Sequence, residues 1–398
     1  MKVAVVGGGP AGATAAMTLA KAGVETYLIE KDLNGDKPCG GGIPCGALRE
    51  FDIPDYLFDR KVSKVGFIAP SGHEVVADLG DGYVGMVDRV KFDPWLREKA
   101  VESGARLIEG VFISLQNPPK SPFSKGGQNK FPPLTKGVEG GFGGKIKVNF
   151  KQGEKEDSIE VDAVTAADGA NSTVAKQVGA ERPQVYLAVQ EKVELTGESK
   201  RFYEDRCEIW YGADISPNFY GWVFPKKDFA TIGTGAPYGH GRFMDDYMAA
   251  FKKRLNGRID GVKLLKKQAH PLPMGPIKKK VYGNVLLVGD AAGTVMPISG
   301  EGIYYGIMSG KLAAEAVIKG DLASYGREWE KIYGSQFRLM TLLRQWFYRD
   351  DKWRERLVRI HEDKDAQERS MSLWLDKERK YPIYSTYWKI LRSLLKHL

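Results

Sequence analysis

Six residues near the N-terminus, Gly7-Gly8-Gly9-Pro10-Ala11-Gly12, have the spacing Gly-x-Gly-x-x-Gly. In such a turn the first glycine permits a tight bend, the second lets a pyrophosphate approach the main chain, and the third allows close helix–strand packing. A helix that begins here would point free amides and its positive dipole end at the anion. A carboxylate at Glu30 would accept hydrogen bonds from an adenosine ribose. The predicted dinucleotide-binding residues are Gly7, Gly9, Pro10, Ala11, Gly12, Glu30 and Lys31.

A second segment with site chemistry is a strand, residues 161–167, that leads into Asp168 and Gly169. Ser172 follows, where its hydroxyl could cap the next helix. Taken alone, this segment could be an ordinary strand-to-helix turn.

A third segment begins with a buried strand, residues 284–288, and delivers another aspartate. The Asp290 carboxylate suits the hydroxyls of a ribityl chain, and a helix from about Gly302 would stabilise negative charge on a reduced flavin. The later cofactor-binding residues are predicted to be Asp168, Gly169, Gly289, Asp290, Pro297, Gly300 and Gly302. Three such segments in this order predict FAD as the cofactor.

The elements that must position these residues alternate between strand and helix. Residues 3–6 read as a buried strand, 13–22 as a helix rich in small residues, and 26–30 as a second strand. Asp93 and Pro94 look like the N-cap and first position of a further helix.

An abrupt change of composition separates two later strands. Residues 117–144 are dominated by Pro, Gly, Lys and Ser, and cannot bury enough apolar surface to offset their ordering entropy. We expect a disordered surface insertion between two strands of a hairpin, Leu107–Leu115 and Lys145–Phe150. A functional lid is the less favoured alternative.

The remaining chain is expected to supply a second sheet and a helical end. Residues 183–272 read mostly as strands, with an amphipathic helix at 244–256, and the last seventy residues read as helical. The predicted domains are a discontinuous FAD-binding domain (1–60, 85–116, 145–180 and 281–320), a substrate-binding sheet domain (61–84 and 181–280), the insertion (117–144) and a C-terminal helical region (321–398).

Composition limits the classes of partner. The 398 residues contain 59 Lys+Arg and 50 Asp+Glu, a net charge of +9 that favours anionic ligands or acidic partners. No basic run with interleaved aromatics predicts nucleic acid, and Lys278-Lys279-Lys280 reads as an exposed turn. No metal-ligand spacing occurs, and three cysteines make no disulfide framework.

The location in the cell is predicted from what the sequence lacks. A strand beginning at Lys2 leaves no room for a signal peptide, and no apolar run is long enough to span a bilayer. We expect a cytoplasmic protein, or one bound peripherally to the inner membrane face. The stripe of apolar residues over 383–398 could dock on a membrane, although packing on the protein itself is the commoner role.

The three cofactor segments together resemble the glutathione-reductase-type FAD fold, in the subgroup that includes para-hydroxybenzoate hydroxylase. Arg89 matches that subgroup's arginine near the flavin chain. The resemblance implies an α/β (α+β) fold: a Rossmann-like FAD domain interleaved with an antiparallel-sheet substrate domain, plus a C-terminal helical segment.

Two further motifs, residues 37–44 (KPCGGGIP) with 50–54, and 217–225 (PNFYGWVFP), resemble the geranylgeranyl reductase family. Phe347-Tyr348-Arg349 extends the similarity toward the C-terminus. The resemblance implies a flavoenzyme that saturates C=C bonds of a polyprenyl chain, with Cys39, Gly40 and Gly41 at the cofactor. Met296-Pro297-Ile298 departs from the chlorophyll branch, which weakens the link to chlorophyll biosynthesis more than the link to the family.

Three aromatic residues give that substrate a place to bind. In a strand, Tyr220, Trp222 and Phe224 fall on one face, and an apolar wall of this kind suits a long hydrocarbon. Periodicity alone favours ordinary core packing; the family resemblance favours substrate binding. Tyr220 and Trp222 are also predicted catalytic residues.

Cys39 is the candidate proton donor. An isolated alkene is a poor hydride acceptor, so a proton source must act as hydride arrives, and a positioned thiol could serve. A small packed residue in a tight loop is an equal alternative.

The reductant and the headgroup stay open at this stage. The chain offers no dedicated NADPH domain, so electrons would come from transiently bound NADPH or from reduced ferredoxin; the family uses both. Two other functions compete: a flavin-dependent aromatic monooxygenase or halogenase, because residues 220–225 faintly resemble a halogenase tryptophan motif, and a non-enzymatic prenyl escort protein. The oligomeric state is not predicted.

Overall fold

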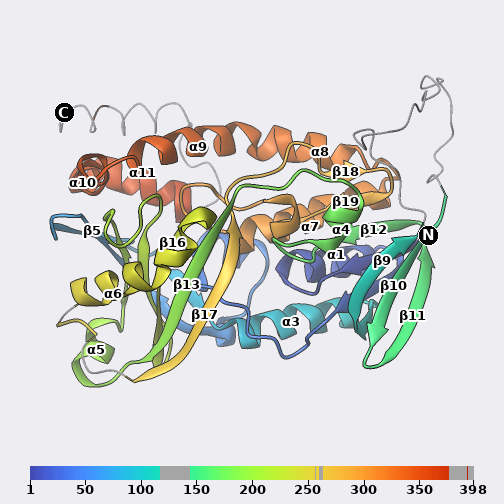
Figure 1. Ribbon diagram of the computed structural model, residues 1–398, viewed down its shortest axis with the longest axis horizontal. Coiled ribbons are helices and arrows are strands. Elements are labelled where there is room, and N and C mark those ends of the chain that lie inside the picture. Colours follow the sequence, from blue (N-terminus) through green and yellow to red (C-terminus); the bar gives the residue numbers. More distant parts are fainter. Residues whose placement is uncertain (117–143, 256, 260–262, 376–391, 393–398) are drawn as a thin grey trace. The chain divides into compact units, whose positions relative to one another are not determined.

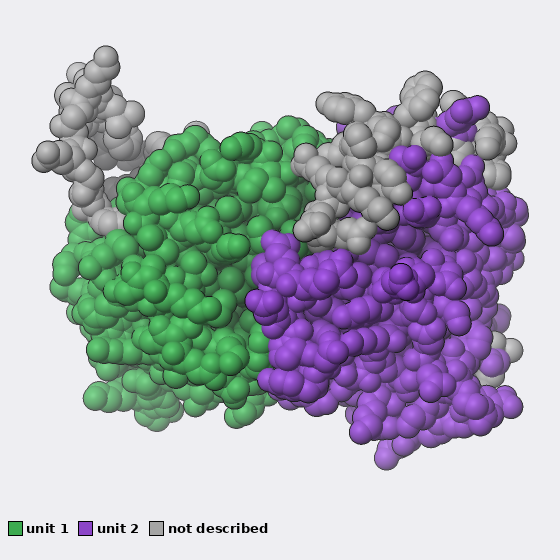
Figure 2. Space-filling model, turned by 180° about the vertical axis from the view of Figure 1, so that it is seen from behind, with its two compact units in different colours: residues 1–35, 93–185, 272–341 green, residues 36–92, 186–271, 342–398 purple. Residues whose placement is uncertain are grey.

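The computed structural model describes residues 1–116, 144–255, 257–259, 263–375 and 392. The chain forms two compact units, each assembled from three separate stretches of sequence (Figure 2). Unit 1 comprises residues 1–35, 93–185 and 272–341, and unit 2 comprises 36–92, 186–271 and 342–398. The mixed α/β fold class is therefore confirmed. Which unit binds which ligand, as the predicted domains assign it, stays a prediction.

Unit 1 is centred on a six-stranded sheet in the order β18-β19-β12-β1-β2-β8. Figure 1 labels its strands β12, β18 and β19. Neighbouring strands run parallel except the short β18, which is antiparallel to β19. Parallel strands are covered on both faces, which explains the unbroken apolar run of the first strand. The strands are β1 (Lys2–Val6), β2 (Glu25–Glu30), β8 (Arg106–Glu109), β12 (Ala163–Ala166), β18 (Val281–Tyr282) and β19 (Val285–Leu287).

Small residues let two helices of this unit pack closely, α1 (Pro10–Lys21) and α7 (Ile303–Ile318). A Cβ added at Gly310 would lie 2.1 Å from the Ala11 carbonyl oxygen, so the two backbones nearly touch. The other helical segments are α4 (Thr173–Gln177), the 3₁₀ turn η3 (Gly289–Ala292), α8 (Ser324–Trp329) and the π turn η4 (Glu330–Gly334).

A three-stranded antiparallel sheet completes unit 1: β9 (Val111–Gln116), β10 (Ile146–Gln152) and β11 (Lys155–Val161). The predicted hairpin is confirmed, because β9 pairs with β10. The single strand expected over 107–115 is wrong: the chain bends at Gly110, whose amide donates to the Glu30 carbonyl, so that β8 joins the parallel sheet. The prediction for the insertion itself concerns residues 117–143, outside the described ranges.

Unit 2 contains a seven-stranded sheet in the order β17-β13-β16-β15-β14-β5-β6 and a three-stranded sheet in the order β3-β7-β4. The large sheet comprises β5 (Lys64–Ile68), β6 (Glu74–Asp78), β13 (Val185–Glu194), β14 (Arg206–Trp210), β15 (Gly221–Pro225), β16 (Phe229–Pro237) and β17 (Leu264–Pro273). The small sheet comprises β3 (Gly42–Pro44), β4 (Phe58–Val62) and β7 (Val84–Val87).

The helices of unit 2 cover these sheets and form the helical end of the described chain. The amphipathic helix expected at 244–256 is α6 (Met244–Arg254), which packs Met248 and Phe251 against the large sheet. The others are α2 (Cys45–Glu50), η1 (Asp55–Leu57), α5 (Gly197–Phe202), η2 (Tyr238–Phe243), α10 (Asp351–Arg359), η5 (Ile360–Glu362) and α11 (Lys364–Leu375). Helix α9 (Ser335–Phe347) begins in unit 1 and ends in unit 2.

The helix predicted to begin at Asp93-Pro94 begins earlier, as α3 (Arg89–Glu102), with Pro94 inside it. The side chain of Asp88 accepts a hydrogen bond from the Val90 amide at 3.3 Å and so caps the first turn. Asp-Pro is a typical helix start, but Pro94 lies in the second turn of this helix, where its missing N–H removes one backbone hydrogen bond.

Candidate active site

The turn between β1 and α1 in unit 1 has the geometry of a phosphate cradle. A Cβ at Gly7 would lie 2.3 Å from the Ala167 carbonyl oxygen, and one at Gly12 would lie 1.8 Å from that of Gly7. A Cβ at Gly9, in contrast, would meet nothing within 4 Å. Gly9 is also the N-cap of α1, and within the described residues no side chain caps this helix. The outer glycines therefore serve chain packing, and the middle one faces free space at a helix N-terminus, as a bound pyrophosphate requires.

Glu30 lies beside this turn, at the end of β2. One carboxylate oxygen accepts from the Gly8 amide at 2.5 Å and the other from the Asp32 amide at 3.1 Å. Lys31 is exposed.

Arg97, on α3, is a residue that the sequence did not reveal. Its guanidinium donates to the carbonyls of Gly8 at 3.3 Å and Leu33 at 2.5 Å, and it is 5% exposed. It ties the glycine turn to the loop after β2. A single arginine in a helix gives no such signal in one sequence.

The Asp168 carboxylate is used within the fold. It accepts from the Ser172 hydroxyl at 2.5 Å and from the amides of Thr173 and Val174 at 2.7 and 3.1 Å, at the start of α4. Ser172 is the N-cap of that helix, as expected, and accepts from the Ala175 amide. Burial raises the pKa of Asp168, and these hydrogen bonds oppose the rise. Its role at the cofactor stays a prediction.

The third cofactor segment joins η3 to α7. Gly302 is the N-cap of α7, and no side chain caps this helix either. The Gly289 amide donates to the Ser309 hydroxyl at 2.8 Å, which fixes η3 against the helix. Pro297 is buried, and Gly300 has a positive φ of 64°, a conformation that favours glycine.

These residues of unit 1 fit FAD. Both α1 and α7 present uncapped N-termini, Gly9 borders free space, and Glu30 places a carboxylate beside the turn. A second stretch with the same glycine spacing, residues 80–85, leads into strand β7 rather than into a helix, so it lacks the helix N-terminus that the first turn provides.

The loop that carries Cys39 lies in unit 2. The Cys39 sulfur accepts from the Gly41 amide at 3.3 Å, and the thiol is free and half-buried. A Cβ at Gly40 would lie 2.5 Å from the Phe224 ring, so the loop packs directly on the aromatic strand. The other two cysteines are free and buried; burial raises the pKa of Cys207 to about 12. Arg89 is buried at the start of α3.

The expected alternation of side chains along β15 is confirmed. Val223 belongs to the apolar cluster that contains α6, and a Cβ at Gly221 would lie 3.0 Å from the Phe251 ring. On the other face, the Tyr220 and Trp222 rings are 6.2 Å apart in an edge-on arrangement. Trp222 lies over Gly233, where a Cβ would come within 2.2 Å of the indole.

Further aromatic residues of unit 2 extend this face. Phe219 stacks on Tyr220 at 4.1 Å, and Tyr211 and Tyr348 lie 6.0 Å apart. Tyr348 comes from the Phe347-Tyr348-Arg349 motif, so that motif contributes to the same aromatic cluster. The indole Nε1 of Trp222 is buried and has no hydrogen-bond partner among the described residues.

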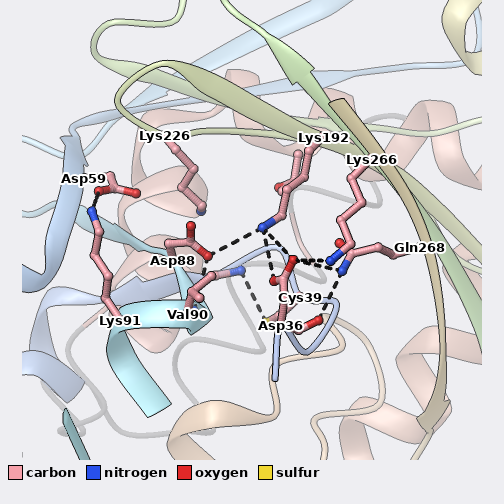
Figure 3. A network of polar contacts seen from close by, with 12 residues as sticks. Asp36, Cys39, Asp59, Asp88, Val90, Lys91, Lys192, Lys226, Lys266 and Gln268 are labelled. Atoms are coloured by element: carbon pink, nitrogen blue, oxygen red, sulfur yellow. Dashed lines mark hydrogen bonds and ion pairs between the residues drawn. The ribbon is translucent and has the colours of Figure 1, made fainter. Parts of the chain in front are cut away.

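Charged side chains lie next to the Cys39 loop (Figure 3). Lys192 pairs with Asp36 at 3.1 Å and with Asp88 at 3.6 Å. Lys226 follows the aromatic strand, and its ammonium donates to the Gly40 carbonyl at 2.7 Å. Burial lowers the pKa of Lys226 to about 8. The sequence did not reveal Lys226 as a site residue, because a lysine after a strand usually reads as exposed.

A second buried lysine corrects one expectation. Lys278 and Lys279 are exposed, but Lys280 is 5% exposed and donates to the Ile277 carbonyl at 3.0 Å. The run of three lysines is therefore not wholly an exposed turn. Within the described ranges, no helix is long and apolar enough to cross a membrane, and no group of His, Cys, Asp and Glu side chains is arranged to hold a metal.

Residues 1–106 match the family model described as pyridine nucleotide-disulphide oxidoreductase. Among solved structures, a geranylgeranyl bacteriochlorophyll reductase-like protein from Thermoplasma acidophilum aligns with a TM-score of 0.75 at 22% identity, covering 100% of this chain and 99% of the other. A flavin-dependent brominase aligns with a TM-score of 0.75 at 17% identity, covering all of both chains. At these identities the structures establish the fold alone.

Sequence relatives are more specific. The chain is 38% identical to geranylgeranyl diphosphate reductase of Nicotiana tabacum, over 95% of this chain and 81% of the relative. The corresponding enzyme of Synechocystis is 38% identical, over 95% and 92%. Digeranylgeranylglycerophospholipid reductase of Methanocaldococcus jannaschii is 30% identical, over 83% and 82%. The chain therefore belongs to the geranylgeranyl reductase family of flavin-dependent oxidoreductases.

Proposed function

We propose that this protein is an FAD-dependent reductase that saturates C=C bonds of a polyprenyl chain of the geranylgeranyl type, either as a diphosphate or attached to a larger headgroup. The observation that carries the proposal is the aromatic face of β15 in a member of this family. Tyr220 and Trp222 are 9% and 6% exposed, and Phe224 packs on the Cys39 loop. A dry aromatic surface suits a hydrocarbon that has no polar group to recognise.

The protein's own groups would divide the work as follows. FAD, once bound and reduced, supplies the hydride. In unit 1, the uncapped N-termini of α1 and α7 and the Glu30 carboxylate would hold the cofactor. In unit 2, the aromatic residues would bind the polyprenyl chain and exclude water. The Cys39 thiol would hold the proton that the second alkene carbon requires.

The role of Cys39 can be tested separately. Cys39→Ser keeps the size of the side chain but replaces the thiol with a far weaker acid. We expect the variant to keep its bound flavin and to lose most of its turnover, by about 10²-fold, the usual contribution of a positioned acid. Undiminished turnover in a flavin-loaded variant would remove Cys39 from the mechanism.

The electron donor belongs to the proposal as well. We propose NADPH or reduced ferredoxin, since the net charge of +9 suits an anionic nucleotide or an acidic protein. We further propose that the protein works in the cytoplasm or peripherally on the inner membrane face, where polyprenyl substrates reside. The apolar stripe over 383–398, which would make that contact, lies outside the described residues.

The decisive test is product mass. Dithionite-reduced protein is incubated anaerobically with geranylgeranyl diphosphate, and the products are analysed by mass spectrometry. We expect the mass of two hydrogen atoms to be added for each saturated bond. The shared fold of the brominase makes halogenation the second candidate; a parallel reaction with oxygen, bromide and a phenol or pyrrole therefore serves as the control. Halogenated or hydroxylated product, without polyprenyl reduction, would overturn the proposal.

A further inference from the structure

Lys226 is a buried lysine at the end of the aromatic strand. It follows β15 directly, and its backbone amide donates to the Phe229 carbonyl at 2.6 Å, where the chain turns into β16. The residue is 1% exposed. Lysine is almost never fully buried unless it is paired, so its position requires a reason.

The ammonium lies against the Cys39 loop. It donates to the Gly40 carbonyl at 2.7 Å, and a Cβ at Gly41 would come within 3.0 Å of the ammonium nitrogen. Within the described part of the chain, no carboxylate is within ion-pair distance of it. The two carboxylates that favour its charged form have other partners: Asp59 pairs with Lys91 at 2.8 Å, and Asp88 pairs with Lys192 at 3.6 Å.

An ammonium buried in this way is costly. One hydrogen bond to a carbonyl does not replace the hydration that burial removes, and an uncompensated buried charge destabilises the folded state. Buried ionisable groups without a structural counter-charge are candidates for a role in function.

The groups that face Lys226 indicate which role. Cys39, Asp59 and Asp88 favour its charged form, with Cys39 the strongest of the three, while Lys192 opposes it. Burial outweighs them and lowers the pKa of Lys226 to about 8, so the ammonium persists at neutral pH. Figure 3 shows Lys226 extending toward Asp88, and the hydrogen bond to the Gly40 carbonyl joins it to the Cys39 loop. Among the described groups that favour the charged form, the two aspartates already have lysine partners, whereas the Cys39 sulfur could gain a negative charge.

We propose that Lys226 is a positioning residue: it holds the Cys39 loop through Gly40 and supplies the counter-charge for the Cys39 thiolate. This rests on the proposed role of Cys39 as the acid. In that step the S–H bond breaks, the alkene π pair forms the new C–H bond with the proton, and hydride adds to the other carbon. Sulfur keeps the S–H electron pair, and solvent returns a proton between turnovers. The Lys226 charge stabilises sulfur while it is anionic.

Alkylation of Cys39 in the flavin-loaded protein, without substrate, tests this directly. Iodoacetamide reacts with thiolate, and peptide mass spectrometry locates the label; Cys45 and Cys207 are buried. We expect Lys226→Met and Lys226→Gln to slow alkylation at neutral pH by at least about tenfold, because the thiolate loses a neighbouring positive charge that favours it. Lys226→Arg should stay close to the wild type.

The Gln and Arg variants separate charge from structure. Gln keeps a donor for the Gly40 carbonyl but no charge, and Arg keeps both. Lys280→Met is the matched control, because Lys280 is also a buried lysine that donates to a carbonyl, and it lies over Trp329 with no thiol among the groups that shift its pKa. In the Lys280→Met variant, Cys39 should be alkylated at the same rate as in the wild type.

Unchanged alkylation in folded Met and Gln variants, or a Gln variant restored to the wild-type rate, would overturn the proposal. Should the Met variant fail to fold, the Gln and Arg variants decide. The alkylation rate of Cys39 is measured without substrate, so this test can fail even if the proposed polyprenyl reduction is correct, and the reverse also holds. Slow alkylation in the Gln variant with no polyprenyl reduction by the wild type would support the coupling of Lys226 to Cys39 and refute the substrate.

Discussion

The two glycine-rich segments, residues 7–12 and residues 39–42, need their glycines for different reasons. At Gly7 and Gly12 the obstacles to a side chain are backbone carbonyls, 2.3 and 1.8 Å from an added Cβ. At Gly40 the obstacle is the Phe224 ring at 2.5 Å. The first segment is shaped by main-chain geometry that any such turn shares. In the second segment Gly41 likewise faces a main-chain atom, the Val87 carbonyl oxygen at 2.2 Å, but Gly40 is limited by a side chain from a distant part of the sequence. The buried ammonium of Lys226 also donates to this segment.

The largest effect is expected for Gly12→Ala. The added Cβ would overlap the Gly7 carbonyl oxygen, and a main-chain atom cannot rotate away. We expect a loss of about 3 kcal/mol or more in the free energy of unfolding, with no bound flavin. Urea unfolding measures the loss of stability, and the visible spectrum measures the bound flavin. A stable yellow variant would show that the turn is looser than described.

Lys226→Met sharpens the comparison through the buried charge. The folded pKa of about 8 lies below the ordinary value of 10.5, so the unfolded state binds more protons between these pH values. Wild-type stability should therefore rise by about 3 kcal/mol from pH 8 to pH 10.5 through this group, and the penalty is fully present below pH 8. The Met variant should lack that rise and be more stable than the wild type at pH 7. Urea unfolding at several pH values measures the stability of the wild type and of the Met variant. If the two stabilities change with pH in the same way, the lowered pKa does not belong to Lys226.

Gly40→Ala tests whether the second segment is limited by side chains. The added methyl group would strike the Phe224 ring, and we expect about 1–3 kcal/mol of destabilisation. Phe224→Leu in the same chain should restore most of it, because the obstacle is removed. No second substitution can restore Gly12→Ala in this way, because the obstacle there is a main-chain carbonyl oxygen. If the double variant is no more stable than Gly40→Ala, the Phe224 contact is not the cause.

Gly9→Ala should have the smallest effect on the fold. Nothing lies within 4 Å of the added Cβ, so the melting temperature of the flavin-free protein should be unchanged. The methyl group would occupy the space predicted for the pyrophosphate, and the dissociation constant of FAD should rise by at least about tenfold, or about 1.4 kcal/mol. Fluorescence titration measures the dissociation constant of FAD. If the Gly9→Ala variant binds FAD as tightly as the wild type, the pyrophosphate does not bind beside Gly9.

The comparison also explains what the sequence could predict. Local periodicity and turn chemistry predict the β1–turn–α1 unit, the later strands that lead into Asp168 and Gly289-Asp290, and the alternation along β15. The N-terminus of α3 was misplaced, because Asp93-Pro94 imitates a cap that Asp88 provides. The strand at 107–115 was misjudged because the bend at Gly110 depends on a hydrogen bond to Glu30, far away in sequence.

Arg97, Lys226 and Lys280 could not be found by the same reasoning. Each is a buried basic residue. Arg97 and Lys226 donate to carbonyl groups far away in the sequence, those of Gly8 and Leu33 for Arg97 and of Gly40 for Lys226. Lys280 donates to the nearby Ile277 carbonyl, but its burial depends on the packing around it. Periodicity assigns such residues to the surface. Cys39 was identified from a family motif, and only the structure placed a buried ammonium beside its loop.

The most direct test of the central claim joins cofactor and substrate in one sample. Protein-bound FAD is reduced with one equivalent of dithionite without oxygen, geranylgeranyl diphosphate is added, and the visible spectrum and product mass are followed together. The account predicts that flavin is reoxidised in proportion to the double bonds saturated, one flavin for each bond. Flavin that stays reduced while the substrate is recovered unchanged would contradict it.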